Sequence, residues 1–200
     1  MSTRMVAANL EAAVAKQLDE SAKVKQELKS MAGAIVGLAE DMYNCLKKNG
    51  KVFFCGNGGS AADSQHIAAE LVGMFLKDRK ALPGIALTVN PSVVTAVSND
   101  WSFDDVFARQ VQALMSKDDL LICISAGGNS PNVVRAVEEA QKIGARTAAL
   151  LGKGGGQTAT MVDRALVVPS NMTPRIQEAH ITIGHIACGL VEEWFVDGRE

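Results

Sequence analysis

Five short apolar segments alternate with segments of helical character across residues 50–200. Each apolar segment is apolar throughout rather than at every second position, which is typical of parallel strands covered on both faces. The alternation predicts an α/β fold of three layers, in which a five-stranded parallel sheet of flavodoxin type lies between helices. The expected strands are Val52–Cys55, Ile85–Val89, Leu120–Ser125, Thr147–Leu151 and Ala165–Val168.

The segments between these strands have the composition of helices. A long closing helix is expected from Pro174 onward, because proline is well tolerated in a first helical turn. The other core helices are expected near residues 60–76, 91–98, 103–115, 131–143 and 155–162.

Residues 4–48 lack proline and place apolar residues three and four positions apart. This period predicts two helices, broken near Lys29–Ala32. They either pack on their own domain or form an arm that packs against another subunit, and we favour the arm for the first helix. We therefore expect one domain over residues 1–200, with a helical oligomerisation arm at 1–49 and an α/β core at 50–200.

Composition excludes several classes of protein. The net charge of -2 lacks the basic character of a nucleic-acid binder, and the hydrophobic fraction of 48 % is enough for a substantial core. No apolar run reaches the length of a membrane span, and the N-terminus lacks the apolar stretch of a signal peptide. The four cysteines are isolated in apolar contexts, which indicates free thiols in a reducing compartment. We expect a cytoplasmic protein with no nucleic-acid or membrane partner.

Two serine-bounded glycine loops follow predicted strands. The first, Gly56–Ser60, offers backbone N–H groups to an oxyanion, and Ser60 is expected to cap the next helix with Asp63 in a capping-box-like pattern. The loop lacks the glycine fingerprint of dinucleotide-binding folds and the lysine of a P-loop, which argues against a nucleotide.

The second loop, Ser125–Ser130, repeats this arrangement. Ser130 is expected to be the N-cap before Pro131, and the two serines can donate to a phosphate together with the amides of residues 127–129. Because both loops lie at the carboxyl ends of strands, they favour phosphate binding. A third loop, Gly152–Gly156 with Lys153, is interpreted as an ordinary strand-to-helix turn.

Three residue types suited to proton transfer or metal binding lie on two predicted helices. His66 and Glu70 are four positions apart and share a helix face, which suits two metal ligands, an acid and a base, or a simple surface pair. On the closing helix, Gln177 and His185 lie about 80° apart and could face one pocket. His180 lies about 140° from His185, so we expect it to serve packing.

Four segments resemble the sugar isomerase (SIS) family, and within it the phosphoheptose isomerases. The resemblance covers nearly the whole chain, including the arm. The segments are "CGNGGSAADSQHIAAE", "SNDWSFDDVFARQV", "ISAGGNSPNVVRAV" and "RIQEAHITIGHIACGLVE".

The resemblance implies an activity and an assembly. Such enzymes interconvert sedoheptulose 7-phosphate and D-glycero-D-manno-heptose 7-phosphate through an ene-diolate. This reaction is the first step towards the ADP-heptose of lipopolysaccharide. They are cytoplasmic homotetramers with sites at subunit interfaces.

The resemblance also implies roles for individual residues. Glu70 would be the general base and His185 its acid partner. One Zn²⁺ per subunit would be held by His66, Glu70, Gln177 and His185. Substrate contacts would come from Asn57, Gly58, Gly59, Ser60, Glu70, Asn99, Asp100, Ser125, Ala126, Gly127, Ser130, Arg175 and Gln177.

The chain departs from the family pattern at three places. Met74 stands where an arginine is frequent, so a cation is lost unless Lys77 or Arg79 replaces it. Ala126 and Gly127 stand where the second loop commonly has two hydroxyl residues. Pro174 stands at a position that is frequently acidic.

Two alternatives come from other functional classes. One is a non-catalytic SIS relative that binds the replication initiator DnaA. In the family pattern, that adaptor lacks the acid–base pair. This chain has both Glu70 and His185, which favours an enzyme. A phosphosugar-sensing regulator would need a basic DNA-binding module, for which the chain has no segment.

Overall fold

The structure is a computed structural model that describes residues 3–198, with side chains from residue 9 onward. Residues 1–2 of the expected arm and residues 199–200 lie outside the described range. Within residues 3–198, no helix has both the length and the apolar character needed to cross a membrane.

The core is a five-stranded parallel sheet with the strand order β2-β1-β3-β4-β5. This is the flavodoxin-like order, so the predicted fold class is confirmed. All residues of β1 and β3 are buried, as the continuously apolar segments predict. The strands are β1 (Val52–Gly56), β2 (Gly84–Ala86), β3 (Leu120–Ser125), β4 (Arg146–Leu151) and β5 (Arg164–Val167).

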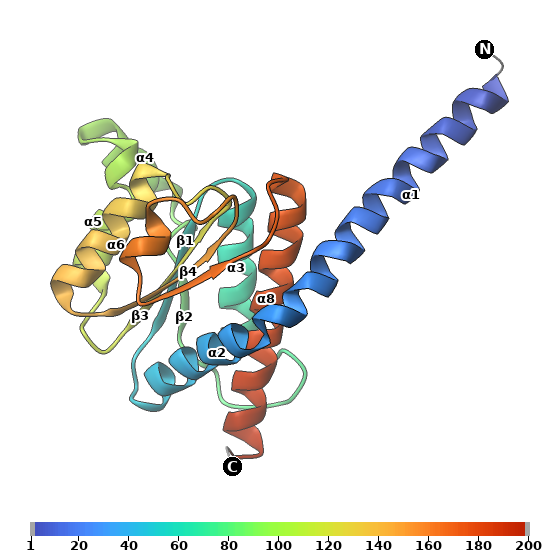
Figure 1. Cartoon of the computed structure of the whole chain (residues 1–200). Helices are drawn as coiled ribbons and strands as arrows, with labels where there is room; N and C mark the ends of the chain where they lie inside the picture. Colours follow the sequence, from blue (N-terminus) through green and yellow to red (C-terminus); the bar gives the residue numbers. More distant parts are fainter. Residues whose placement is uncertain (1–2, 199–200) are drawn as a thin grey trace.

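Helices cover both faces of the sheet (Figure 1). Alternate strand residues point to opposite faces, so Phe54 belongs to one apolar core and Phe53 to the other. The Phe54 face carries α2 (Ala32–Lys47), α3 (Gly59–Val72) and α8 (Thr173–Val196). The Phe53 face carries α4 (Pro91–Asp100), the 3-10 helix η2 (Phe103–Asp105), α5 (Ala108–Leu114), α6 (Pro131–Ile143) and α7 (Thr158–Met161).

Several element boundaries differ from the prediction. The strand expected at 85–89 is β2 at 84–86, and the helix expected at 103–115 is divided into η2 and α5. Glycine explains two further differences. Helix α3 ends at Val72 rather than near 76, because Gly73 donates the last helical hydrogen bond, to Ala69, and then leaves the helix in an extended conformation. Helix α7 has only four residues because the three glycines before it adopt positive φ. The expected break near 29–32 is confirmed as the 3-10 helix η1 (Leu28–Met31).

The N-terminal helix α1 (Thr3–Glu27) extends beyond the rest of the molecule (Figure 1). Its C-terminal part joins the core, where Val24 is buried. The Arg175 guanidinium of α8 donates to the carbonyl of Gln17. Farther out, three apolar side chains spaced four residues apart are 63 %, 58 % and 66 % exposed: Leu10, Val14 and Leu18.

Helix α8 packs closely against α3 and against the end of β4. A Cβ atom on Gly184 would lie 2.5 Å from Ile67 Cδ1, so the glycine lets the two helices approach. His180 is fully buried, and its Nε2 donates to the Leu151 carbonyl at 3.1 Å. The packing role expected for His180 is therefore confirmed, and this hydrogen bond fixes α8 to the sheet.

We expect His180 to make the stability of the protein depend on pH. Burial lowers its pKa from 6.5 to about 4, although the hydrogen bond to the Leu151 carbonyl acts in the opposite direction. Between these two pH values the unfolded chain binds a proton that the folded chain does not. The contribution of His180 to the free energy of unfolding should therefore fall by roughly 3 kcal/mol as the pH falls from 6.5 to 4, at ~1.4 kcal/mol per pKa unit. The raised pKa of Asp63 on α3 acts in the opposite direction, equally in the wild type and in a His180 variant.

Urea denaturation at pH 7.5 and pH 4.5 measures this loss. The variant His180→Gln can still donate to the Leu151 carbonyl but does not titrate, so its loss of stability on acidification should be smaller. An equal loss in both proteins would show that His180 is not the responsible group.

Candidate active site

The two serine-bounded loops meet where the strand order reverses. Strands β1 and β3 are neighbours, and Gly56 pairs with Ile124 at their carboxyl ends. Directly beyond, the Asn57 and Asn132 side chains exchange two amide hydrogen bonds of 2.9 Å each. These bonds hold the N-terminal ends of α3 and α6 together. Open α/β sheets bind ligands at such a switch point, and helix N-termini attract anions.

The first loop depends on its glycines. A Cβ on Gly56 would lie 2.7 Å from the Ile124 carbonyl oxygen, and Gly58 has a φ of 58°. Gly58, not Ser60, is the N-cap of α3, so the predicted capping role of Ser60 with Asp63 is wrong. The positive φ moves the start of the helix to Gly59. Ser60 then lies inside the first turn, where it is 3 % exposed.

Asp63 lies on α3 between the loop and His66. Burial raises its pKa to about 6, and the nearby His66 acts in the opposite direction. Its Oδ2 is buried and has no hydrogen-bond partner among the described residues. The Asp63 carboxyl group therefore takes up a proton at a higher pH than an ordinary aspartate does.

The second loop has the expected N-cap and an internal hydrogen bond. Ser130 is the N-cap of α6, and among the described residues its hydroxyl oxygen accepts no hydrogen bond from an N–H group of that helix. The Ser125 hydroxyl oxygen accepts the Gly128 N–H at 3.1 Å, which leaves its own proton to be donated. The amide of Gly128 is thus already engaged within the loop.

The third loop, predicted to be an ordinary turn, supports the second. The Gly128 carbonyl accepts hydrogen bonds from both the backbone N–H and the hydroxyl of Thr158, at 2.9 and 2.8 Å. Asn129 Oδ1 accepts the Gln157 N–H at 2.8 Å. Gly128 has a φ of 64°, and a Cβ there would lie 1.9 Å from the Gly155 carbonyl oxygen. The two loops therefore touch backbone to backbone.

His66, Glu70 and His185 form one cluster. His66 Nε2 lies 3.0 Å from Glu70 Oε1 and 3.2 Å from His185 Nε2. The three ligand atoms all lie within 4.8 Å of one another, and the side chain of Glu70 is 20 % exposed. The close packing of α8 on α3 brings His185 to the pair on α3. This convergence favours a site over a simple surface pair.

The cluster has the donor set and spacing of a zinc site. Zinc binds imidazole nitrogen and carboxylate oxygen in tetrahedral geometry, and bonds of about 2.0–2.2 Å place neighbouring ligand atoms about 3.4 Å apart. The two shortest separations in the cluster, 3.0 and 3.2 Å, are close to that value. The residues present therefore fit a zinc ion.

Gln177 lies nearer the start of α3. A Cβ on Gly59 would be 2.5 Å from Gln177 Nε2, so the amide rests on the backbone of the first loop. Gln177 and His185 thus both face α3, as their angular separation allows. Gln177 connects α8 to the loop, and His185 connects it to the cluster.

Three other predicted site residues make hydrogen bonds elsewhere. Asn99 and Asp100 are at the exposed end of α4, where Asn99 Nδ2 donates to Asp100 Oδ1 at 2.8 Å. Arg175 contacts the arm and also pairs with Glu178 at 3.0 Å. Their substrate roles stay predictions.

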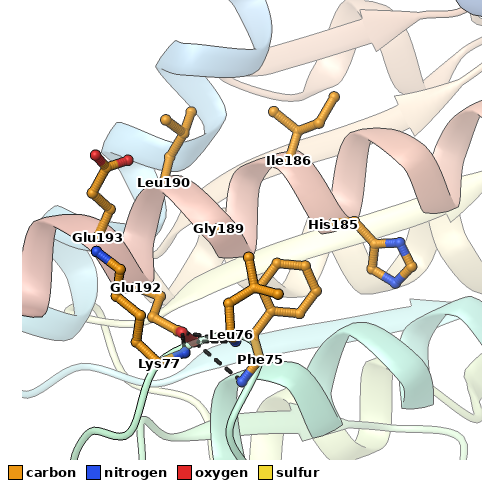
Figure 2. Close-up of a pocket in the computed structure, with 9 residues that line it drawn as sticks. All are labelled: Phe75, Leu76, Lys77, His185, Ile186, Gly189, Leu190, Glu192 and Glu193. Carbon is orange, nitrogen blue, oxygen red and sulfur yellow. Dashed lines mark hydrogen bonds between the residues drawn. The ribbon is translucent and has the colours of Figure 1, made fainter.

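Two cavities adjoin the predicted site residues. One, of about 520 Å³, lies beside His185 between α8 and the loop after α3 (Figure 2). Its walls include Phe75, Ile186 and Leu190. The other, of about 150 Å³, lies against the first glycine loop, and Phe103 and Phe107 are among the residues that line it. The chain therefore has space both at the loops and at the cluster.

Comparison with known proteins identifies the family of the chain. The SIS domain family matches residues 17–152. The phosphoheptose isomerase of Nitratiruptor sp. is 59 % identical over 150 residues, covering 75 % of this chain and 80 % of the relative. That of Campylobacter jejuni is 49 % identical over 182 residues, covering 91 % and 98 %.

A solved structure extends the agreement to the fold. The phosphoheptose isomerase GmhA from Neisseria gonorrhoeae has a TM-score of 0.88 and 43 % identity, over 92 % of this chain and 99 % of that one. The chain belongs to the phosphoheptose isomerase branch of the SIS-domain family. The resemblance noted in the sequence is thus confirmed.

Met74, at the position where the family often has an arginine, lies in the loop that follows α3. Met74 is 65 % exposed. Lys77 lines the larger cavity, but its Nζ pairs with Asp197. Arg79 donates to the carbonyls of residues 70 and 71. Both candidate replacements for the missing arginine are therefore engaged elsewhere.

Sequence reasoning missed three residues that support the candidate site. They are Asn132, Thr158 and Glu192. Only Glu192 carries a usable signal, since it lies four positions after buried Cys188 on the apolar face of α8. A charged residue on a buried face is a candidate for a paired or hydrogen-bonded role.

Replacing Gly128 with alanine should separate the second and third loops. The positive φ and the contact with the Gly155 carbonyl predict a loss of at least ~2 kcal/mol in the free energy of unfolding. The matched control is Gly127→Ala, since no described atom lies within 4 Å of a Cβ there and its φ is not positive.

Urea denaturation of both variants measures the difference. The control should change stability by less than ~1 kcal/mol in either direction. Equal stabilities of the two variants would contradict the close contact between the loops.

Proposed function

We propose that the chain interconverts sedoheptulose 7-phosphate and D-glycero-D-manno-heptose 7-phosphate through an ene-diolate. It is a sugar-phosphate isomerase by family, like the relatives reported above. The observation that carries the proposal is the convergence of Glu70 and His185, whose ligand atoms lie within 4.8 Å of each other beside a loop suited to phosphate.

The phosphate would bind between the N-terminal ends of α3 and α6. The Asn57–Asn132 pair fixes these ends, and Ser125 and Ser130 have hydroxyl groups to donate. Ser60 and His66 are six positions apart on α3, about 9 Å along the helix axis. A seven-carbon sugar phosphate can span that distance, so one substrate can occupy both places.

The cluster supplies the proton chemistry of the isomerisation. Moving a carbonyl between adjacent carbons requires a base that takes a proton from one carbon and returns it to the next, and a donor to the neighbouring oxygens. Glu70 has the carboxylate for the first role. His185 has an imidazole for the second, and Phe75 stacks against that ring with the centroids 5.6 Å apart.

We assign one Zn²⁺ per subunit to the first three of the predicted ligands, His66, Glu70 and His185, while Gln177 stays a predicted fourth ligand because its amide rests beside Gly59. The donor set and the short separations among the first three support this assignment. When bound, zinc would polarise the carbonyl group of the substrate as a Lewis acid. Glu70 would then have two tasks, to bind zinc and to move a proton. A carboxylate has two oxygens, so one oxygen can serve each task.

We further propose a homotetramer with sites at subunit interfaces. The exposed stripe Leu10, Val14 and Leu18 supports an oligomerisation role for the arm of residues 1–49, attached to one α/β domain of residues 50–200. An isolated helix face of this kind gains stability only when another surface covers it.

The proposed setting is the cytoplasm, on the route to the ADP-heptose of lipopolysaccharide. All four cysteines are free and buried, which fits a reducing compartment. The adaptor alternative, binding to DnaA, has no support in the relatives compared above, which are isomerases by name.

Glu70→Gln should reduce turnover by at least ~10³-fold, because the amide cannot take a proton from carbon. An NMR assay that follows aldose formation from sedoheptulose 7-phosphate measures this loss. Retained turnover would remove Glu70 from the base role.

The control for this test is Glu138→Gln, at an exposed position of α6, which should keep full activity. Sedimentation of both variants should give the mass of a tetramer. A wild-type protein that is folded but inactive on sedoheptulose 7-phosphate would overturn the proposed function itself.

Protein purified without chelator should contain about one zinc per chain. His66→Ala and His185→Ala should lose most of this metal, because each removes a ligand from the cluster. His180→Gln should keep it, since His180 is bonded to Leu151 instead. Elemental analysis measures the content, and full activity in metal-free protein would contradict the assignment.

A further inference from the structure

A buried carboxylate on α8 holds the loop that follows α3. Glu192 lies seven positions after His185, and its side chain is 2 % exposed. It accepts the backbone N–H groups of Phe75 at 3.1 Å and Leu76 at 2.9 Å, and that of Lys77 (Figure 2). Burial by itself would raise the pKa of Glu192, but these hydrogen bonds and nearby Arg79 hold it below its ordinary value.

Arg79, the ion-pair partner of Glu192, also contacts α3, the helix that carries Glu70. Arg79 Nε lies 3.5 Å from Glu192 Oε2, and the arginine side chain is 5 % exposed. Its guanidinium donates to the carbonyls of Glu70 at 2.6 Å and Leu71 at 2.9 Å. A cation at these last carbonyls stabilises the C-terminal end of α3. One buried ion pair therefore joins α8, the loop and the end of α3.

The same loop places an aromatic ring on the imidazole of the cluster. The rings of Phe75 and His185 are stacked, with an angle of 28° between their planes and 5.6 Å between their centroids. Gly189 lies against this ring, since a Cβ there would be 3.4 Å from Phe75 Cε1, an ordinary van der Waals distance. Phe75 thus limits the orientations that the His185 ring can adopt.

A buried ion pair is an inefficient way to gain stability alone. Removing two charges from water is costly, and well-packed apolar residues often stabilise a protein equally or better. What this ion pair supplies is one defined loop conformation, because three consecutive N–H groups converge on one carboxylate.

We propose that Glu192 is a positioning residue of the isomerase site. It anchors residues 75–77 so that Phe75 holds the His185 ring towards His66 and Glu70, and through Arg79 it fixes the end of α3. The expected effect on turnover rests on the proposed function. The positioning of His185 relative to His66 and Glu70 does not depend on it.

The test compares Glu192→Gln with Glu193→Gln, its neighbour on the exposed side of α8. Both remove one negative charge. Zinc affinity, measured by competition with a chelator in the absence of sugar, should fall about tenfold in Glu192→Gln and stay unchanged in Glu193→Gln. The value of kcat should fall similarly, while KM should change little, because the phosphate loops do not depend on this anchor.

A second variant separates positioning from simple loss of stability. Phe75→Leu keeps the anchor but removes the ring, so it should also weaken zinc binding. The double variant should bind zinc no more weakly than Glu192→Gln alone, since both changes act through one contact. Independent effects that multiply would overturn the proposal, as would wild-type zinc affinity in Glu192→Gln.

NMR spectra of the metal-free protein test the position of the Phe75 ring without zinc or substrate. The His185 ring protons should show a ring-current shift in NMR spectra that is lost in both Phe75→Leu and Glu192→Gln and kept in Glu193→Gln. If Glu192→Gln fails to fold, an unchanged shift and zinc affinity in Phe75→Leu would overturn the proposal. If the wild type does not convert sedoheptulose 7-phosphate, these two readouts still decide the role of Glu192, so the two failures are distinguishable.

Discussion

The position of α8 against α3 is the constraint on which the site depends. Gly184 lets Ile67 approach α8, and the His180 hydrogen bond to the Leu151 carbonyl fixes the helix relative to β4. Together these contacts set the axial position of α8. A displacement of one residue would rotate the helix by about 100° and move His185 away from His66. Packing between two helices, rather than any single loop, therefore assembles the cluster.

Helix α3 explains why one segment carries both a glycine loop and a pair of proton-handling residues. Its N-terminus lies at the switch point of the sheet, where an anion is favoured, while His66 lies at its middle and Glu70 in its last turn. A helix is a rigid spacer with a fixed rise per residue. The distance between phosphate and reacting carbons can thus be set by sequence spacing, while α8 completes both places through Gln177 and His185.

The candidate site residues are held in place by other residues that belong to no sequence motif. The second glycine loop is held by Thr158, whose N–H and hydroxyl both reach the Gly128 carbonyl. The cluster is bordered by a loop whose amides converge on Glu192. In both places a buried polar group satisfies backbone groups that would otherwise be left without partners, and so selects one conformation of a loop.

Much of the fold follows from local pattern. Continuously apolar segments determined the five strands and glycines marked the loops, because strand burial and backbone freedom are properties of short stretches. Spacing alone placed His66 beside Glu70 and set His180 apart from His185. Only tertiary structure decided that His185 meets this pair, that Gly58 rather than Ser60 caps α3, and that the third loop supports the second. Those outcomes depend on contacts between segments far apart in the chain, and on backbone angles that such contacts impose, which no local pattern encodes.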